Sequence, residues 1–366
     1  MKLPVQPPIL PMLAKRVGAL PSSGDWIFEP KWDGFRSLVF RDGEEVFLQS
    51  RDSKPLNRYF PELLPPILAQ LPERSVLDGE IVIARDGQLD FDALQMRLHP
   101  AASRVNKLAA AIPASIVLFD LLLDGDRDLR DIPFAERRGR LEAVLAQAKP
   151  PLYITPATKD LATAQDWFAR FEGAGLDGVM AKPPSGTYEP NKRVMLKIKH
   201  ERECDCVVAG FRWHKKGNRD RVGSLLLGLY DEAGALQHVG VCASFTDQKR
   251  QELVQFLAPY RERALENHPW KEWAEYAVTD ENGEKRMPGG YSRWNQGKDL
   301  AWEPVRAELV LQVAYDHMQG SRFRHTAQFR RFRTDKPVRQ CDYAQLEIVA
   351  PEEIASIFGR AGSAAS

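Results

Sequence analysis

The sequence predicts an α+β protein of two domains, the first a mixture of mainly antiparallel strands with helices and the second rich in short strands. Three observations lead to this prediction. Over roughly the first 200 residues, strand-like runs alternate with helical patterns. Past about Arg202, short apolar runs separated by Gly and Asp turns dominate. The length of 366 residues is too great for one typical domain and short for three.

The first half is expected to begin with an irregular, proline-rich segment over residues 1–25. Strands and turns follow from Trp26 to about Ile83, with Arg41-Asp42-Gly43 as a hairpin turn signal. We expect the following further elements: a short helix within 61–68, a buried strand at 76–83, a helix at 91–98, a strand at 116–122, helices at 134–147 and 162–171, and strands at 178–182 and 196–199.

The second half is expected to contain about five strands and one helix. The strands are predicted at 206–211, 224–230, 238–241, 309–315 and 323–333, the helix at 247–260, and a Gly/Pro/Trp-rich connection at roughly 268–300. Such a set in about 150 residues is typical of a small Greek-key β-barrel of the OB type. We therefore divide the chain into domains 1–200 and 203–350 and a tail 351–366, with the boundary near Lys199–Glu203.

Composition excludes a membrane protein and favours a reducing, cytoplasmic setting. Hydrophobic residues make up 43% and charged residues 28% of the chain, and no apolar run approaches the roughly 20 residues of a membrane span. The N-terminus lacks the apolar core of a secretory signal. The four cysteines (Cys204, Cys206, Cys242 and Cys341) have no metal-ligand spacing, so we expect them to be structural.

Positive charge is concentrated locally although the net charge is only +1. Residues 322–339 hold seven Arg or Lys against one Asp, and residues 212–221 hold five against one Asp. Charge runs are usually solvated faces, but two in one half of a nearly neutral chain indicate a surface for a polyanion.

Polar residues embedded in apolar strands are the candidates for a functional site, because burying them is costly unless they serve a purpose. Taken singly, each is more often a charge at the end of a strand. Together they supply a lysine nucleophile, further cations and several acids, which is the set needed for phosphoryl or nucleotidyl transfer. The chain has no Walker-type Gly-rich loop, so side chains on strands must hold the nucleotide. The set comprises Lys31, Asp33, Arg36, Ser50, Arg51, Asp78, Glu80, Asp120, Asp177, Lys182, Lys197 and Lys199.

These residues fall into motifs whose order is highly specific. They are Lys31-Trp32-Asp33-Gly34-Phe35-Arg36, Ser50-Arg51, Asp78-Gly79-Glu80, Phe119-Asp120, Gly178-Val179-Met180-Ala181-Lys182, Lys197-Ile198-Lys199 and Arg333-Thr334-Asp335-Lys336. With them the chain resembles the ATP-dependent DNA ligases of the covalent nucleotidyltransferase superfamily, most closely the bacterial ligase C type and the ligase domain of ligase D. The one departure is Asp177, where most of the superfamily has Glu.

The resemblance implies an adenylating nucleotidyltransferase domain (ATP-grasp-like) of antiparallel sheets with helices, followed by an OB-fold β-barrel. It also implies three chemical steps. The amine of Lys31 attacks the α-phosphorus of ATP and expels pyrophosphate. The AMP then passes to the 5′-phosphate at a nick, and the 3′-hydroxyl finally attacks that phosphate and releases AMP.

The same resemblance assigns roles to individual residues. Lys197 and Lys199 would bind the α-phosphate, and Arg36 and Arg51 the ribose and the 5′-phosphate of the nick. Phe119 would stack on adenine, with Glu29 and Lys182 also at the nucleotide. Asp33 and Asp177 would hold the metal directly or through water, with Glu80 at the ribose or the metal. Arg333, Asp335 and Lys336 would orient pyrophosphate after the second domain closes about a hinge near Lys199–Glu203.

The implied cofactors are ATP, as AMP donor, and Mg²⁺ or Mn²⁺. The implied partner of this monomer is nicked duplex DNA, bound mostly through phosphates in a salt-sensitive way. DNA-repair proteins, such as a Ku-type end binder and a repair polymerase, are further partners that the resemblance suggests. Because the chain starts only about 30 residues before Lys31, we expect no separate N-terminal DNA-binding domain and an accessory role in repair.

Four alternatives share part of this pattern. An mRNA capping guanylyltransferase has the lysine, Asp-Gly-Glu and Arg-x-Asp-Lys motifs, but the run from Trp302 to Asp335 favours ligase C. An RNA ligase would seldom carry Arg-x-Asp-Lys, and an NAD-dependent ligase would carry an extra N-terminal domain. A non-enzymatic OB module would require all the motifs to be relics.

Overall fold

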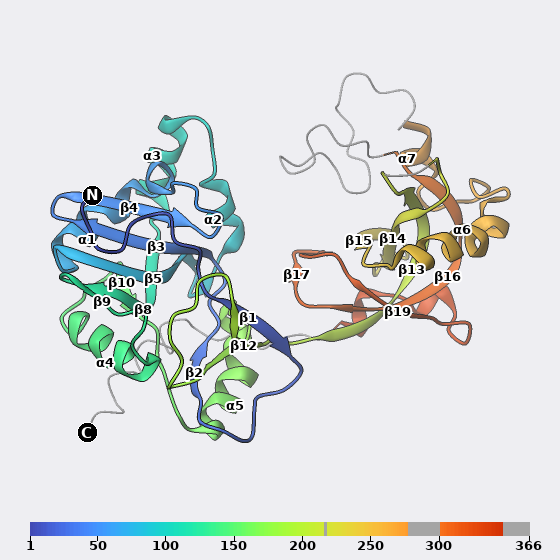
Figure 1. Cartoon of the computed structure of the whole chain (residues 1–366). Coiled ribbons are helices and arrows are strands. Elements are labelled where there is room, and N and C mark those ends of the chain that lie inside the picture. The colour runs from blue at the N-terminus through green and yellow to red at the C-terminus, as the bar shows by residue number, and fades with distance from the viewer. Residues whose placement is uncertain (216–217, 277–300, 347–366) are drawn as a thin grey trace. The chain divides into compact units, whose positions relative to one another are not determined.

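A computed structural model describes residues 1–215, 218–276 and 301–346 (Figure 1). The predicted tail, Lys216 of the second basic run and most of the Gly/Pro/Trp-rich connection lie outside these residues. The described residues form two compact units, which divide between His200 and Glu201. No described helix has both the length and the apolar character that crossing a membrane requires.

Unit 1 contains two sheets with helices against them. The larger sheet has the order β10 (Leu152–Ile154), β8 (Ser115–Asp124), β5 (Arg74–Val82), β3 (Phe35–Asp42) and β4 (Glu45–Ser50), with β9 (Arg127–Asp128) also paired to β8. The smaller has the order β1 (Leu13–Val17), β12 (Arg193–Ile198), β11 (Val179–Lys182) and β2 (Ile27–Pro30). Pairing is antiparallel except between β1 and β12 and between β10 and β8. The predicted α+β class is therefore confirmed.

The helices of unit 1 follow the predicted pattern in part. They are α1 (Leu64–Gln70), α2 (Phe91–Met96), α3 (Ala102–Ala111), α4 (Phe134–Val144) and α5 (Leu161–Arg170), and a short hairpin joins β6 (Ala84–Arg85) to β7 (Gln88–Leu89). Asp90 and Asp160 cap α2 and α5 by accepting hydrogen bonds from first-turn N–H groups. The prediction missed α3, and it was wrong to leave all of residues 1–25 irregular, because β1 lies there.

Helix α4 lies against β8 of the larger sheet (Figure 1), and a buried ion pair fixes it there. Arg137 on α4 donates to both carboxylate oxygens of Asp120 on β8, at 2.8 and 3.0 Å. Their side chains are 0% and 2% exposed. Asp120 therefore has a structural partner, which the sequence motif alone did not reveal.

Replacing Asp120 with alanine is expected to destabilise unit 1 by about 3–5 kcal/mol, because Arg137 would keep a buried charge without its partner. The melting temperature should fall by about 10 °C. The matched control is Asp128→Ala, which removes a half-exposed pair with Arg130 and should cost about 1 kcal/mol or less. Equal shifts for the two variants in calorimetry would contradict the role assigned to the buried pair.

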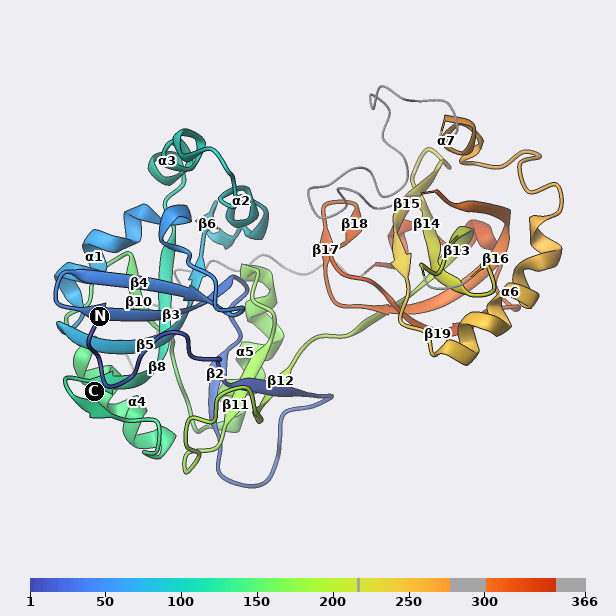
Figure 2. The same cartoon turned by 45° about the horizontal axis from the view of Figure 1, so that its top comes forward.

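Unit 2 is built on a five-stranded antiparallel sheet (Figure 2). The strand order is β15 (Leu236–Cys242), β14 (Val222–Tyr230), β13 (Arg202–Trp213), β16 (Glu303–Tyr315) and β19 (Gln328–Phe332), and the described helices are α6 (Asp247–Arg261) and α7 (Lys271–Tyr276). This is the arrangement expected of the OB-type domain. The predicted single strand at 323–333 is wrong. Phe323 ends β18 (Arg322–Phe323), which pairs with β17 (Met318–Gln319) through a turn at Gly320, and β19 begins afterwards.

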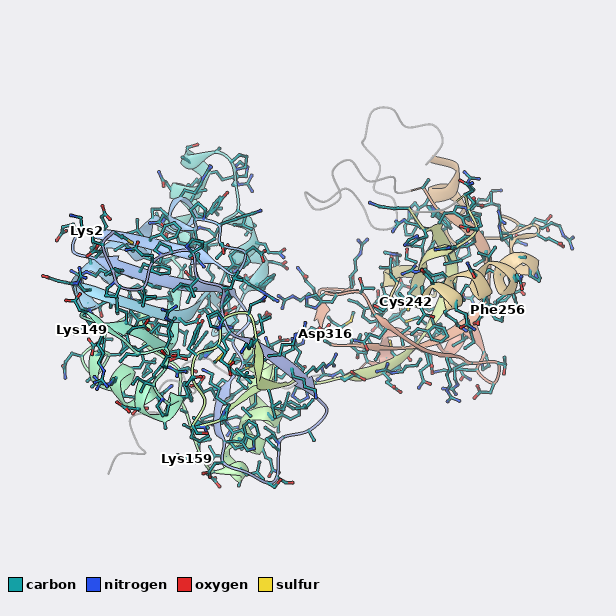
Figure 3. The ribbon with its side chains drawn as sticks, in the orientation of Figure 1. Lys2, Lys149, Lys159, Cys242, Phe256 and Asp316 are labelled. Carbon is teal, nitrogen blue, oxygen red and sulfur yellow. The ribbon has the colours of Figure 1, made fainter. Side chains whose placement is uncertain are left out.

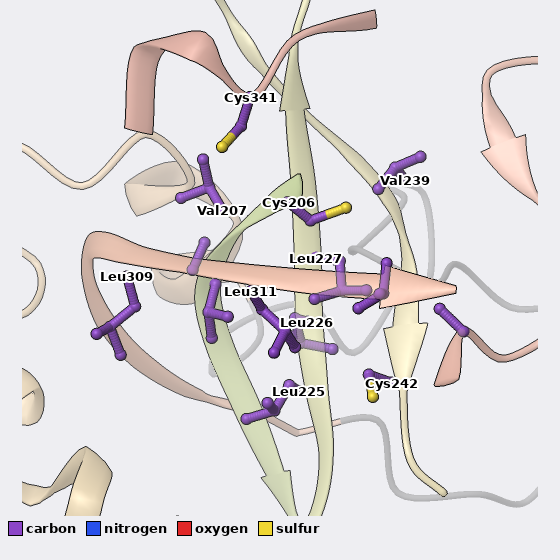
Figure 4. Close-up of a cluster of buried hydrophobic side chains, with 14 of the residues drawn as sticks. Cys206, Val207, Leu225, Leu226, Leu227, Val239, Cys242, Leu309, Leu311 and Cys341 are labelled. Carbon is purple, nitrogen blue, oxygen red and sulfur yellow. The ribbon is translucent and has the colours of Figure 1, made fainter. Parts of the chain in front are cut away.

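Leucine and valine side chains from β13, β14 and β16 fill the core of unit 2 (Figure 4). All four cysteines lie in the described residues and are buried and free, as a structural role requires. On the outer side, Phe256 of α6 (labelled in Figure 3) packs against Phe332 of β19 with ring centroids 4.5 Å apart. The helix is therefore held on the sheet at the edge strand.

Candidate active site

Lys31 follows β2 directly and is tied by its backbone to the segment that leads into β11. Its N–H donates to the carbonyl oxygen of Gly178 at 2.8 Å, and the N–H of Asp177 donates to its carbonyl oxygen at 2.9 Å. Gly178 has a φ of +128°, and an added Cβ would lie 2.0 Å from the carbonyl oxygen of Ile198. Only glycine fits this position. The neighbouring Trp32 is buried and donates its indole N–H to Thr155 Oγ1 at 2.8 Å, which fixes the chain after the lysine.

The amine of Lys31 shares one carboxylate oxygen with the amine of Lys199. Both Nζ atoms lie 2.5 Å from Oδ2 of Asp177. The Asp177 side chain is 4% exposed, whereas those of Lys31 and Lys199 are 20% and 16% exposed. The structure thus brings together three residues that are far apart in sequence. Asp177, predicted as a metal ligand, here accepts hydrogen bonds from the predicted nucleophile and from a predicted phosphate-binding lysine.

A third lysine adds to the positive charge of this cluster of side chains. Burial lowers the pKa of Lys197, and the neighbouring charges of Lys199 and Lys31 lower it further, while Asp177 opposes the shift. Arg51, which follows β4, acts on Lys197 in the same direction as the lysines. Four cations thus interact around one buried carboxylate, an arrangement suited to a phosphate group.

Arg36 is anchored on β3 opposite Glu80 of β5. Its guanidinium donates to both oxygens of Asp78, at 2.8 and 2.6 Å. The hydroxyl of Tyr188 donates to the same carboxylate at 2.7 Å. Asp78 is fully buried, so this pair fixes the direction of the guanidinium. Tyr188 could not be identified from the sequence, because a single tyrosine in a loop carries no pattern.

The ring of Phe119 lies close to two cations. The guanidinium carbon of Arg36 lies 5.1 Å and Nζ of Lys182 4.7 Å from the ring centroid. Lys182 also pairs with the buried Glu29 at 2.6 Å. Behind them, Arg138 of α4 donates to Glu29 at 3.2 Å and to the carbonyl oxygen of Thr155 at 2.7 Å. A partly exposed aromatic ring among fixed polar groups is suited to a planar base.

Arg138 was not predicted from sequence. It lies on a helix that contains several charged residues, where an arginine usually faces solvent, yet its side chain is only 8% exposed. The only available signal was the pair Arg137-Arg138, which places two cations on different faces of one helix.

Glu80 lies close to Lys31, Arg36, Asp33 and Asp78, all of which influence its ionisation. Burial raises the pKa of Glu80 to about 7, although Lys31 and Arg36 act to lower it. Gly34 permits this close packing, because an added Cβ would lie 2.1 Å from the carbonyl oxygen of Ile81 and 3.0 Å from Cγ of Glu80. Two carboxylates, those of Glu80 and Asp33, therefore face one region.

These carboxylates fit Mg²⁺ or Mn²⁺ only in combination with a bound phosphate. The described residues contain no group of three or more His, Cys, Asp or Glu side chains that could hold a metal. Mg²⁺ is commonly bound by one or two carboxylates together with substrate phosphates. Glu80 and Asp33 match that pattern, and the shared contacts of Asp177 with two lysines match it less well.

The raised pKa of Glu80 predicts a pH dependence of stability in the metal-free protein. The unfolded chain loses this proton near pH 4.5, whereas the folded protein holds it to about pH 7. The stabilising contribution is complete below pH 4.5 and is lost as the pH rises to about 7, on the order of 3 kcal/mol. Melting curves between pH 4.5 and 7.5 should show this loss in the wild type and its absence in Glu80→Gln. The exposed control Glu44→Gln should behave as the wild type. An identical pH dependence in Glu80→Gln would contradict the assignment.

The predicted residues of unit 2 also lie together. Arg333 pairs with Asp335 at 2.7 Å and reaches Asp205 at 3.3 Å, and Lys336 reaches the same oxygen of Asp205 at 2.9 Å. The hydrogen bond from Arg333 lowers the pKa of Asp335 to about 2. Asp205 was not singled out from the sequence, where it reads as one residue of an alternating strand.

Family models and known relatives match almost the whole chain. The family model for the ATP dependent DNA ligase domain matches residues 11–199, and the model for the ATP dependent DNA ligase C terminal region matches residues 218–336. DNA ligase C2 of Mycolicibacterium smegmatis and DNA ligase C of Mycobacterium tuberculosis are each 55% identical over 351 residues, which cover 95% of this chain and 96% of each relative. A solved Lig E DNA ligase aligns with 88% of this chain and 99% of its own, at a TM-score of 0.54 and 16% identity, which supports the fold.

Proposed function

This chain belongs to the ATP-dependent DNA ligase family, and we propose that it seals nicks through a covalent AMP adduct on Lys31. The observation that carries the proposal is the shared contact of the Lys31 and Lys199 amines with the buried carboxylate of Asp177. It supports the proposal because the amine proposed as the nucleophile lies beside a lysine proposed to bind the α-phosphate.

In the first step, the amine of Lys31 attacks the α-phosphorus of ATP and pyrophosphate leaves. The attack requires the neutral amine, and Asp177 accepts a hydrogen bond from this amine, so it is in position to receive the proton. Lys197 and Lys199 would then balance the charge on the α-phosphate. Both are supplied by β12 or the residue that follows it, so the sheet sets their distance from Lys31.

The nucleotide would be held by groups that are already fixed. Phe119 would stack on adenine, with Glu29 and Lys182 at its edge, and Arg36 would bind the ribose. Arg51 would bind the 5′-phosphate of the nick. A base pocket whose polar groups are paired before binding loses little entropy when the nucleotide arrives.

Glu80 and Asp33 would hold Mg²⁺ or Mn²⁺ on the phosphates, and Asp177 would contribute through water. When bound, the metal would act as a Lewis acid that neutralises charge on the phosphates. The carboxylates of Glu80 and Asp33 must be ionised to bind the metal. Glu80 must therefore lose the proton that its burial favours.

We further propose the functional division expected from sequence, an adenylation domain over 1–200 and an OB domain over 203–350. Arg333, Asp335 and Lys336 would orient pyrophosphate when the OB domain closes, and the basic surface would bind nicked duplex DNA. A monomer acting in DNA repair, with a Ku-type end binder and a repair polymerase as partners, remains part of this proposal. The cytoplasmic setting remains a prediction.

A nicked duplex with a labelled 5′-phosphate tests the function directly. We expect sealing with ATP and Mg²⁺ or Mn²⁺, and at least 100-fold less with GTP or NAD, because the family is ATP-dependent and a site whose polar groups pair with adenine would leave them unpaired with guanine. A duplex without the 5′-phosphate is the control and should not be joined. Sealing driven equally by GTP would favour the capping-enzyme alternative, and no sealing with any nucleotide would overturn the proposal.

A further inference from the structure

Asp205 lies in the second-unit strand β13 and faces two of the residues assigned to pyrophosphate. Its Oδ2 accepts from Nζ of Lys336 at 2.9 Å and from Arg333 at 3.3 Å. Its side chain is 10% exposed, and Oδ1 is buried without a hydrogen-bond partner among the described residues. A buried carboxylate is costly unless cations compensate it, so Asp205 and these two cations depend on one another.

The backbone around Asp205 is fixed on both sides. Its N–H donates to the side-chain oxygen of Gln345 at 2.8 Å, and the amide of Gln345 donates back to its carbonyl oxygen at 3.0 Å. At this position β13 also pairs with β16, where Gln312 lies opposite Asp205. The carboxylate therefore projects from a backbone position that is held by Gln345 and by β16.

Arg333 and Lys336, by contrast, lie just beyond the edge strand β19, in a segment with no regular structure. The backbone N–H of Arg333 donates to the carbonyl oxygen of Val310, which anchors only the start of this segment. Two long cationic side chains close together repel one another and would turn toward water. Nevertheless their side chains are only 20% and 19% exposed. Asp335 cannot hold both inward, because its side chain is 64% exposed and it pairs with Arg333 alone among described residues.

We propose that Asp205 is a positioning residue that holds Arg333 and Lys336 side by side, so that both meet the pyrophosphate leaving group together. The carboxylate of Asp205 accepts hydrogen bonds from both side chains and keeps them aligned until the nucleotide binds. An anionic oxygen of the pyrophosphate would then compete with this carboxylate for the same two donors. This inference rests on the proposed function of the Arg333-x-Asp335-Lys336 motif. Asp205 itself does not touch the reacting atoms.

The test compares the first and last steps under single-turnover conditions. In Asp205→Ala, formation of the AMP adduct at saturating ATP should slow by roughly 10- to 100-fold, because misplaced binding groups lose effective concentration. Sealing of a pre-adenylated nick, in which no pyrophosphate leaves, should stay within about twofold of the wild type. Asp205→Asn keeps one acceptor oxygen without the charge and should show an intermediate loss in the first step only.

A double-mutant comparison separates positioning from a purely structural role. In an Arg333→Ala/Lys336→Ala background, adding Asp205→Ala should change the first step little, because nothing remains to be positioned. Glu303→Gln is the matched control. It removes a partly buried carboxylate of unit 2 that contacts Trp213 and Arg261, and it should leave both steps unchanged.

Equal losses in the two steps, wild-type rates in both, or unfolding of both Asp205 variants at the assay temperature would each overturn the inference. The rate of adduct formation in Arg333→Ala distinguishes a failure of this inference from a failure of the proposed function. If Arg333→Ala forms the adduct at the wild-type rate, the motif has been assigned wrongly. If Arg333→Ala is slow and Asp205→Ala is normal, only the role of Asp205 is wrong.

Discussion

Replacing Lys31 with alanine is expected to abolish the covalent AMP adduct and, with it, all ATP-dependent sealing. The reason is chemical, because the proposal assigns the phosphorus–nitrogen bond to the amine of Lys31, and alanine has no nucleophilic group. Lys199 shares the Asp177 oxygen with Lys31, but its role in the proposal is to balance charge on the α-phosphate. The loss should exceed about 10⁴-fold in a labelling assay with ATP.

One further variant and one further substrate make this result specific. Lys31→Arg retains a cation for the ion pair with Asp177 and should fold normally, yet it should also form no adduct, because a guanidinium stays protonated. Both variants should keep measurable sealing of a pre-adenylated nick, which does not require the lysyl adduct. A labelled adduct that survives in either variant would contradict the assignment of the nucleophile.

Replacing Asp177 with alanine is the second change with a large expected effect. Two ammonium groups now share one oxygen at 2.5 Å each, and without the carboxylate they would repel one another and move apart. Because a small displacement of a nucleophile is costly, adduct formation should slow on the order of 100-fold. Rapid-quench measurement of the first step checks this expectation.

The choice of metal distinguishes this account of Asp177 from that of a direct metal ligand. If the loss comes from misplaced lysines, exchanging Mg²⁺ for Mn²⁺ should not restore the rate of Asp177→Ala. Asp177→Glu retains the acceptor with one further methylene group, so it should recover a large part of the activity. Recovery of Asp177→Ala in Mn²⁺ alone would instead indicate that the carboxylate ligates the metal.

Much of the site was predictable because it depends on local sequence. The Lys31 motif, the acids of β5, and the lysines at the end of β12 each stand out as charges in or beside apolar strands. The structure brings several of them together around Asp177, Glu80 and Phe119, whereas Asp120 pairs with Arg137 instead. Such residues are conspicuous in a sequence, because a charge buried in the interior of a strand is costly unless it has a partner.

What was missed depends on contacts between distant segments. β1 pairs with β12 about 180 residues away, and a strand whose partner is so remote leaves no turn signal beside it. Tyr188 and Arg138 act only through the groups they orient, Asp78 and Glu29. Asp205 is informative only once the fold brings residues 333–336 against it. A sequence pattern indicates which face of a helix or strand is buried, but it does not indicate which distant residues pack against that face.

The central claim is that one amine, that of Lys31, carries AMP before DNA takes part. The most direct test is peptide mapping by mass spectrometry of the protein after incubation with ATP and a divalent metal, under conditions that preserve a phosphoramidate. The account predicts a single AMP on the peptide that contains Lys31. AMP attached to a different residue, or no AMP on a protein that still seals nicks with ATP, would contradict it.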